Sequence, residues 1–201
     1  MKKIVLTAVF VLISTGIFAQ TQTNSISVNG SHTYSIAPEY HASMIVSLNN
    51  VYYEPQLTSL SEIKATYLTK LEKAGIDRNS IIDDDLSYAI LGYDKEGTIF
   101  RYKTSSLEEM KKFLSVKSIG VTKSETNIKA TLGHEEMATY AEAAYKDAKK
   151  KAEQIAKKIG KSVGKVTSFG DSNSRKIKES LYYGSLITER EYYISVSFEL
   201  L

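Results

Sequence analysis

The chain has 201 residues and no cysteine, which excludes disulfide bonds and thiolate metal sites. Lys2 and Lys3 account for two of its 26 basic residues, which stand against 23 acidic ones and three histidines. Without the first few residues the chain is therefore close to neutral, and we expect no nucleic-acid partner.

The N-terminus has the pattern of a secretory signal peptide. Its first residues read MKKIVLTAVFVLISTGIFAQ, with two lysines, an apolar run from Ile4 to Ile13, and Ala19 where a small residue should precede cleavage. The alternative is a transmembrane anchor, but the run is shorter than the roughly 20 apolar residues that a span requires. We predict a signal peptide over residues 1–19 and one domain, either undivided or of two lobes, over residues 20–201.

The first half of this domain shows both strand and helix periodicity. Alternating apolar residues predict strands at residues 26–30 and 40–48. Apolar residues spaced by three or four then predict a helix, which begins at a capping box of Ser59 and Glu62 and ends at Gly75. The runs LSYAIL and TIFRYKT flank GYDKEG and predict a β-hairpin in which Gly97 takes a positive φ.

The second half contains the longest element. After a short helix from Leu107, capped by Ser106 and Glu109, and a strand at residues 121–132, a helix is predicted from residue 135 to residue 159. Its apolar stripe is mostly alanine, so its backbone can approach the surface it covers: Met137, Ala141, Ala144, Ala148, Ala152, Ile155 and Ile159. A strand at KVTSF, a long loop at about residues 170–190 and a final strand, YYISVSFELL, follow.

One segment, IAKKIGKSVGKV, resembles two catalytic motifs. Gly160 to Gly164 fits the G-x-S-x-G of a nucleophile elbow, but that motif needs a strand before the serine and a helix after it, and here the order is reversed. A phosphate loop would need glycine where Ile155 stands. We predict that Gly160 caps the long helix and that Ser162 belongs to the following turn.

No other pattern predicts a catalytic, cofactor-binding or metal-binding residue. His32, His41 and His134 lack metal-site spacing, although His32 and His41 could meet across a hairpin. Asp83, Asp84 and Asp85 lack the glycine and distal glutamate of a calcium loop and are interpreted as a solvated turn. Tyrosine pairs, at positions 52–53, 182–183 and 192–193, could line a groove for glycan or peptide. We therefore interpret the protein as non-enzymatic and without a cofactor.

The charges are unevenly distributed along the chain. Residues 39–96 carry 5 basic and 10 acidic side chains, whereas residues 123–178 carry 13 basic and 7 acidic ones. Such a division can favour binding to nucleic acid, binding to anionic lipid, or self-association between the basic part of one subunit and the acidic part of another. Two solvated faces are the alternative.

Several segments together resemble the SIMPL-domain family of bacterial periplasmic antigens and oxidative-stress defence proteins. The shared positions run from one end of the domain to the other: Val28 and Gly30; Pro38 and Ala42; Ala144, Ala148, Lys151, Ala152, Ala156 and Gly160; Gly164 and Val166; Val196, Phe198 and Leu200. The chain departs from the pattern at Glu39-Tyr40-His41, where the family has aspartate after Pro38.

The resemblance implies an α+β fold, in which two main helices, one long and alanine-striped, pack against an antiparallel or mixed sheet. It also implies periplasmic residence, with secretion or outer-membrane association as alternatives, and homo-oligomers that could protect against oxidative stress. We expect an exported assembly protein of the cell envelope, with Tyr182, Tyr183 and Leu186 as candidate interface residues. The alternative is a periplasmic module that binds glycan or peptide through tyrosine-rich surfaces.

Overall fold

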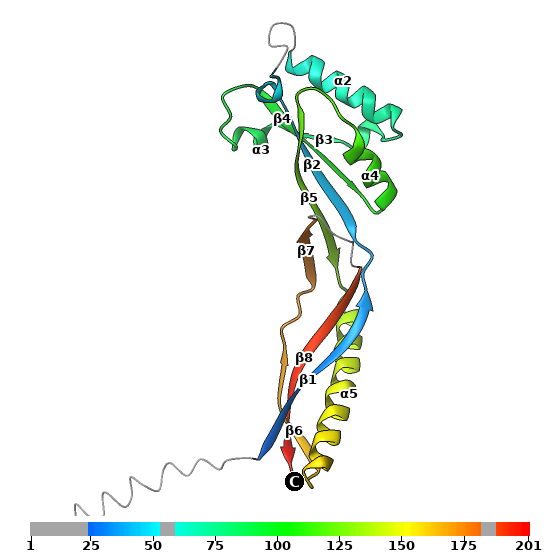
Figure 1. Ribbon diagram of the computed structural model, residues 1–201, viewed down its shortest axis with the longest axis vertical. Coiled ribbons are helices and arrows are strands. Elements are labelled where there is room, and N and C mark those ends of the chain that lie inside the picture. The colour runs from blue at the N-terminus through cyan, green and yellow to red at the C-terminus, as the bar shows by residue number, and fades with distance from the viewer. Residues whose placement is uncertain (1–23, 53–58, 182–187) are drawn as a thin grey trace, which may run out of the picture. The chain divides into compact units, whose positions relative to one another are not determined.

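The computed structural model describes residues 24–52, 59–181 and 188–201 (Figure 1). These residues divide into two compact units. Within the described chain, unit 1 contains residues 24–32, 141–172 and 193–201, and unit 2 contains residues 33–140 and 173–192. The predicted signal peptide lies outside the described residues.

Unit 2 contains a five-stranded antiparallel sheet. Its order is β3 (Ile82–Asp84), β4 (Gly97–Thr104), β2 (Glu39–Ser47), β5 (Val121–Thr131) and β7 (Lys176–Ser180). The central strand β2 pairs with β4 through Met44 opposite Phe100, and with β5 through Tyr40 opposite Ile128. The strands predicted at residues 40–48 and 121–132 are confirmed.

Two helices, α2 (Leu60–Lys73) and α4 (Leu107–Ser115), pack against this sheet (Figure 1). Their predicted starts are confirmed: Ser59 and Glu62 form the capping box, and the Ser106 hydroxyl accepts a hydrogen bond from the Glu109 amide. Gly75 ends α2 with a φ of 86°. Short 3₁₀ turns follow β2 at Leu48–Asn50 and precede β3 at Arg78–Ser80.

Aromatic rings fill the core between these helices and the sheet. Tyr67 of α2 stacks on Phe100 with ring centroids 6.1 Å apart, and Phe113 of α4 lies 4.9 Å from Tyr102. Burial raises the pKa of the Tyr67 hydroxyl, because the phenolate would lose its hydration. Burial of these large side chains is the main stabilising term in unit 2.

Unit 1 is built around a three-stranded sheet in the order β1 (Ser25–Ser35), β8 (Glu189–Leu200) and β6 (Val163–Asp171), covered by α5 (His134–Lys158). β8 buries Ile194, Val196 and Phe198, which confirms the predicted alternation. The buried stripe of α5 differs in its last members from the prediction. Ala144, Ala148, Ala152 and Ala156 are fully buried, whereas Ile155 and Ile159 are 46% and 58% exposed. At 3.6 residues per turn, a spacing of four moves the stripe about 40° around the helix at each step. The buried stripe therefore winds around α5 and ends at Ala156, and Ile155 lies outside it.

Two predictions of local structure are wrong. Residues 86–91 (LSYAIL) were expected to be the first strand of a hairpin, but most of them belong to the helix α3 (Asp85–Ala89), and it is Gly92, not Gly97, that has a positive φ. The loop expected at residues 170–190 contains the strand β7, which pairs with β5 through Lys178 opposite Lys129. β7 is an exposed edge strand that pairs through its backbone, and it therefore needs no apolar alternation.

The predicted α+β class is confirmed, with two antiparallel sheets where we expected one. No helix among the described residues is both long enough and apolar enough to cross a membrane.

Candidate functional site

The face of the five-stranded sheet opposite α2 and α4 is polar. Successive strand residues point to opposite faces, so β2, β4 and β5 bury alternate side chains under the helices and turn the others outward. α3 covers only one end of this outward face, where Tyr88 contacts Gly97 and shares a hydrogen bond with the Ser47 hydroxyl.

Strand register brings side chains that are distant in sequence into rows on this face. One row runs Lys103, His41, Asn127 and Ser180, from β4 through β2 and β5 to β7. The next row runs Glu39, Lys129 and Lys178. On the other side, Ser43 of β2 lies opposite Arg101 of β4. Directly opposed residues in such rows have Cβ atoms about 4.5–5.5 Å apart, so their side chains interact.

These rows line a basin of about 330 Å³. Its wall contains four cations and one carboxylate, together with neutral polar and apolar groups: Arg101, Lys103, Lys129, Lys178, Glu125, His41, Ser43, Asn127, Ala42, Ile82 and Tyr102. All of them belong to unit 2. The lining residues therefore carry a net positive charge, which would favour a negatively charged ligand.

Three of the four cations already have carboxylate partners. Lys103 lies 3.4 Å from Glu39, Lys178 lies 3.6 Å from Glu125, and Arg101 lies 2.8 Å from Asp84. Within the described part of the chain, no carboxylate lies at ion-pair distance from Lys129.

Glu39 bridges two of the basic groups at the rim. Partial burial opposes the negative charge, but Lys103 and His41 outweigh it and hold the pKa of the Glu39 carboxyl below its usual value. The His41 Nε2 atom lies 2.6 Å from the Glu39 carboxylate, yet outside hydrogen-bond geometry. The imidazole is thus close to an anion without being fixed by a directional bond.

Asn127 is a buried polar residue of the basin lining. It is only 5% exposed, and its Oδ1 atom has no hydrogen-bond partner among the described residues. A buried acceptor without a partner costs about 1–3 kcal/mol. Its Oδ1 atom has less than 1 Å² of exposed surface, so a molecule in the basin could not reach it.

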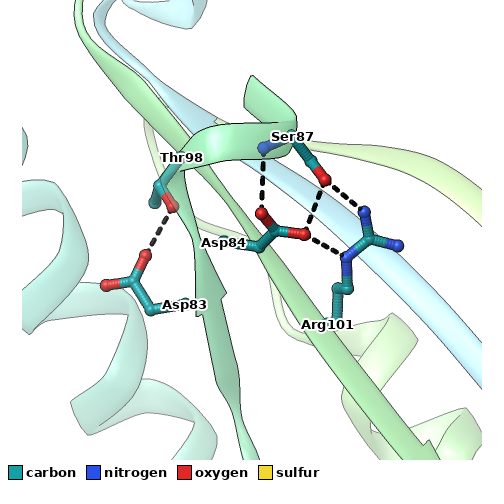
Figure 2. Close-up of polar contacts among 5 residues, drawn as sticks. All are labelled: Asp83, Asp84, Ser87, Thr98 and Arg101. Carbon is teal, nitrogen blue, oxygen red and sulfur yellow. Dashed lines mark hydrogen bonds and ion pairs between the residues drawn. The ribbon is translucent and has the colours of Figure 1, made fainter. Parts of the chain in front are cut away.

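The acidic run at residues 83–85 is structural (Figure 2). The Asp84 carboxylate accepts hydrogen bonds from the amide and hydroxyl of Ser87, at 2.9 and 2.6 Å, and from Arg101. The two Ser87 hydrogen bonds, with Arg101 adding to them, lower the pKa of Asp84. Asp83 accepts a hydrogen bond from Thr98 and pairs with Lys64. The interpretation as a solvated turn is therefore wrong: β3 ends here and Asp84 caps α3.

The motif-like segment at residues 155–166 is a helix end. Gly160 has a φ of 72°, the Lys161 amide donates to the Ala156 carbonyl at 2.9 Å, and Ser162 exchanges backbone hydrogen bonds with Leu201. Ser162 therefore stands after a helix and before β6, as predicted, and not on a nucleophile elbow.

The other sequence candidates do not converge. His41 lines the basin, and His134 lies 2.7 Å from Arg175. No group of three or more metal-binding side chains occurs among the described residues. Of the tyrosine pairs, Tyr192 is buried, whereas Tyr193 and Tyr52 are 53% and 75% exposed. Tyr182, Tyr183 and Leu186 lie outside the described residues.

The sequence prediction missed the basin. His41 was considered as a metal ligand and Ala42 as a family position, but no other side chain of the basin was singled out, because outward polar residues on a strand are typical of any solvated sheet face. Only the register of β2, β4 and β5 brings them together, and register depends on contacts that no single segment encodes.

Comparison with known families identifies the chain. A family model described as SIMPL, a protein of unknown function (DUF541), matches residues 19–186. The chain belongs to the SIMPL family. A search of curated proteins finds no match.

Most of the residues that carry the SIMPL resemblance lie in unit 1, and several of them are packing positions. A Cβ on Gly30 would lie 2.0 Å from the Ala144 carbonyl oxygen and 2.8 Å from the Ala148 Cβ, so β1 and α5 approach as closely as two backbones can. Val196 and Phe198 are buried on the same sheet. These positions thus specify how unit 1 packs, whereas Pro38 and Ala42 of the same pattern lie in unit 2, where Ala42 lines the basin.

Proposed function

We propose that this SIMPL protein is an exported, non-enzymatic protein of the cell envelope that acts as a homo-oligomer. The observation that carries the proposal is the exposure of β6, which forms an edge of the unit 1 sheet. Its Val166 and Phe169 side chains are 40% and 51% exposed.

An edge strand of this kind favours association. Among the described residues no strand lies on the outer side of β6, so its outward N–H and C=O groups can pair with a strand of another chain. Proteins that remain monomeric commonly blunt such an edge with proline, with charged side chains or with β-bulges. β6 carries Lys165 and two register shifts near its start but has no proline, and its exposed valine and phenylalanine would gain from burial.

The sequence supports the same function in three further ways. The predicted signal peptide over residues 1–19 favours a periplasmic location, with secretion or outer-membrane association as alternatives. The acidic balance of residues 39–96 and the basic balance of residues 123–178 would orient subunits head to tail. The resemblance to oxidative-stress proteins favours a protective role.

Sedimentation velocity at micromolar concentration tests the assembly. We expect an oligomer at low salt that weakens at high salt, because exposed charge pairs contribute only about 0–1 kcal/mol each and are screened. A monomer at low salt would contradict the proposal. An oligomer whose mass does not change with salt concentration would support assembly but exclude an electrostatic contribution to it.

The predicted interface at Tyr182, Tyr183 and Leu186 can be tested in the same experiment. Replacing all three with serine should reduce the oligomer mass if these side chains supply apolar contacts. Unchanged assembly of the triple variant would exclude them from the interface.

The second candidate is a periplasmic module that binds glycan or peptide through tyrosine-rich surfaces. Exposed Tyr52 and Tyr193 favour it, but Tyr192 is buried in the core. A glycan array tests this candidate, and binding that survives Tyr193→Ala and Tyr52→Ala would contradict it.

A further inference from the structure

We propose that β6 pairs with β6 of a second copy of the chain about a two-fold axis, and not with another strand of that copy. The unit 1 sheets of the two copies then form one continuous antiparallel sheet, with three strands from each copy. This inference rests on the proposed function, because it names the partner of the β6 edge on which that assembly depends.

The first step of the argument concerns β1, the opposite edge of the same sheet, where α5 occupies outward backbone groups. The Asn24 carbonyl accepts a hydrogen bond from the end of β8, so the even-numbered residues here turn their backbone groups toward β8. Asn29 and Ser31 therefore turn theirs outward. The Ser31 amide donates to the Asp147 carboxylate at 2.9 Å, and the Asn29 carbonyl accepts from Lys151 at 3.3 Å. A strand from another copy would have to displace both side chains.

The second step concerns the edges of the five-stranded sheet, which are poorer partners for β6. β3 is only three residues long, and β7 carries Lys176 and Lys178 among its five residues. Short edge strands and edge lysines both oppose pairing between molecules. β6 has one lysine, Lys165, near its start, and from Ser168 to Asp171 it pairs residue by residue with β8. This regular segment leaves a row of outward backbone groups for its own copy.

The third step is the position of the exposed apolar side chains of β6. Val166 lies opposite Phe198 of β8, and Phe169 lies opposite Val196, so each pair points to the same face of the sheet. That face is covered by α5, because the buried Phe198 ring lies 6.1 Å from the Tyr145 ring. Val166 and Phe169 are on the same face yet remain exposed, since β6 is the outermost strand. Pairing of two β6 strands would bury these side chains of both copies along one seam.

The two-fold axis determines the geometry of this contact. An axis perpendicular to the sheet makes the two β6 strands antiparallel and keeps every side chain on its own face, so the residue at the axis lies opposite its own copy. Opposed Cα atoms are then about 4.5–5.5 Å apart, within the roughly 4.4–6.8 Å that a disulfide bond requires. The contact closes at two copies, and the head-to-tail charge contacts of the proposed assembly would join such pairs into larger oligomers.

Cysteine scanning tests the pairing directly, because the chain has no cysteine and every disulfide must come from an introduced residue. Single variants place one cysteine at each position from 166 to 171, all of which are exposed. After mild oxidation, we expect covalent dimers on a non-reducing gel. Their yield should peak at one position and fall at least about fivefold two residues away, because the two sulfur atoms are then separated by four residues of strand.

Two controls identify the partner strand. Glu153→Cys, at an exposed position of α5, reports random collision and should give almost no covalent dimer. Ser27→Cys places a thiol on β1, and mass spectrometry of oxidised mixtures with each β6 variant identifies the linked peptides. We expect links between two β6 peptides. A majority of β6–β1 links, or a yield at Glu153→Cys equal to the best β6 position, would overturn the proposal.

Sedimentation velocity of the unmodified protein separates this inference from the proposed function. A monomer at micromolar concentration contradicts both. An oligomer for which no scanned position gives a β6–β6 disulfide overturns the two-fold pairing and leaves the assembly to another surface. Circular dichroism of each variant shows whether it folds, and folded variants at neighbouring positions keep the scan decisive if one variant does not.

Discussion

At the scale of single residues, Gly30 determines how closely β1 can approach α5. The Ala144 carbonyl oxygen and the Ala148 Cβ occupy the space where a side chain on Gly30 would begin. A contact of 2.0 Å with backbone cannot be relieved by rotation of a side chain. The glycine is therefore required by tertiary packing, not by its own φ.

Gly30→Ala should destabilise the protein by about 1–3 kcal/mol, because the helix must move away from the strand. Gly170→Ala in β6 is the matched control, since its Cβ would meet nothing nearer than 3.9 Å. Urea denaturation of both variants measures the difference. Equal stability of the two variants would show that α5 packs less tightly on β1 than the structure indicates.

Asp147 links the same helix to β1 by hydrogen bonds. Its carboxylate lies 2.6 Å from the Lys151 ammonium and accepts a hydrogen bond from the Ser31 amide at 2.9 Å. These two contacts, the Lys151 one first, lower the pKa of Asp147 below its ordinary value of 3.8. Lys151 also donates to the Asn29 carbonyl, so the pair joins helix and strand.

The lowered pKa of Asp147 predicts a pH dependence of stability. A carboxylate with a depressed pKa in the folded state stabilises that state above the pKa of the unfolded chain, and the contribution is lost as pH falls through the folded value. Asp147→Asn should therefore lower the urea midpoint at about pH 7 and have no effect well below about pH 3. Glu153→Gln, at an exposed position of α5, is the control. A stability difference that persists at acid pH would mean that the charge of Asp147 is not its cause.

At the scale of elements, the small side chains of α5 allow its backbone to lie close to the strands of the unit 1 sheet. Its buried positions Ala144, Ala148, Ala152 and Ala156 are all alanine and all fully buried. The opposite side carries exposed lysines. Ile155 and Ile159 remain outside this stripe, and their exposure adds apolar surface to unit 1.

Ala148→Glu should destabilise the protein by at least about 3 kcal/mol, because it places a charge without a partner between helix and sheet. Ala138→Glu, at an exposed position of the same helix, is the matched control and should be nearly neutral. Thermal unfolding, monitored by circular dichroism, compares the melting temperatures of the two variants. A melting temperature unchanged by Ala148→Glu would show that this side of α5 is exposed in solution.

At the scale of the whole molecule, assembly depends on surfaces that each unit presents to other copies. Phe169 of β6 is half exposed on an edge strand, and lysine on such an edge opposes strand pairing between molecules. Phe169→Lys should therefore shift the protein toward monomer in sedimentation velocity.

The control for this variant is Ile119→Lys, which adds the same charge at another exposed apolar position, 62% exposed and outside the strands. It should leave assembly unchanged. Equal loss of assembly in both variants would point to added charge as the cause, and retained assembly in Phe169→Lys would exclude the β6 edge.

The sequence by itself determined the features that depend on neighbours within one or two turns of chain. The caps at Ser59 and Ser106, the helix ends at Gly75 and Gly160, and the alternation of β8 all follow from local hydrogen bonds and periodicity. For the same reason the G-x-S-x-G segment could be recognised as a helix end without a structure.

Tertiary structure decided the features that depend on contacts between segments far apart in the sequence. Asp84 binds Ser87 and Arg101, which replaces the predicted hairpin with β3 and α3. β7 exists because β5 offers it an edge, although its own side chains have no pattern. The basin depends on register: a one-residue slip of β5 would turn Asn127 and Lys129 to the other face. Because backbone pairing and close packing are set by the partner strand or helix, no single segment of the sequence contains that information.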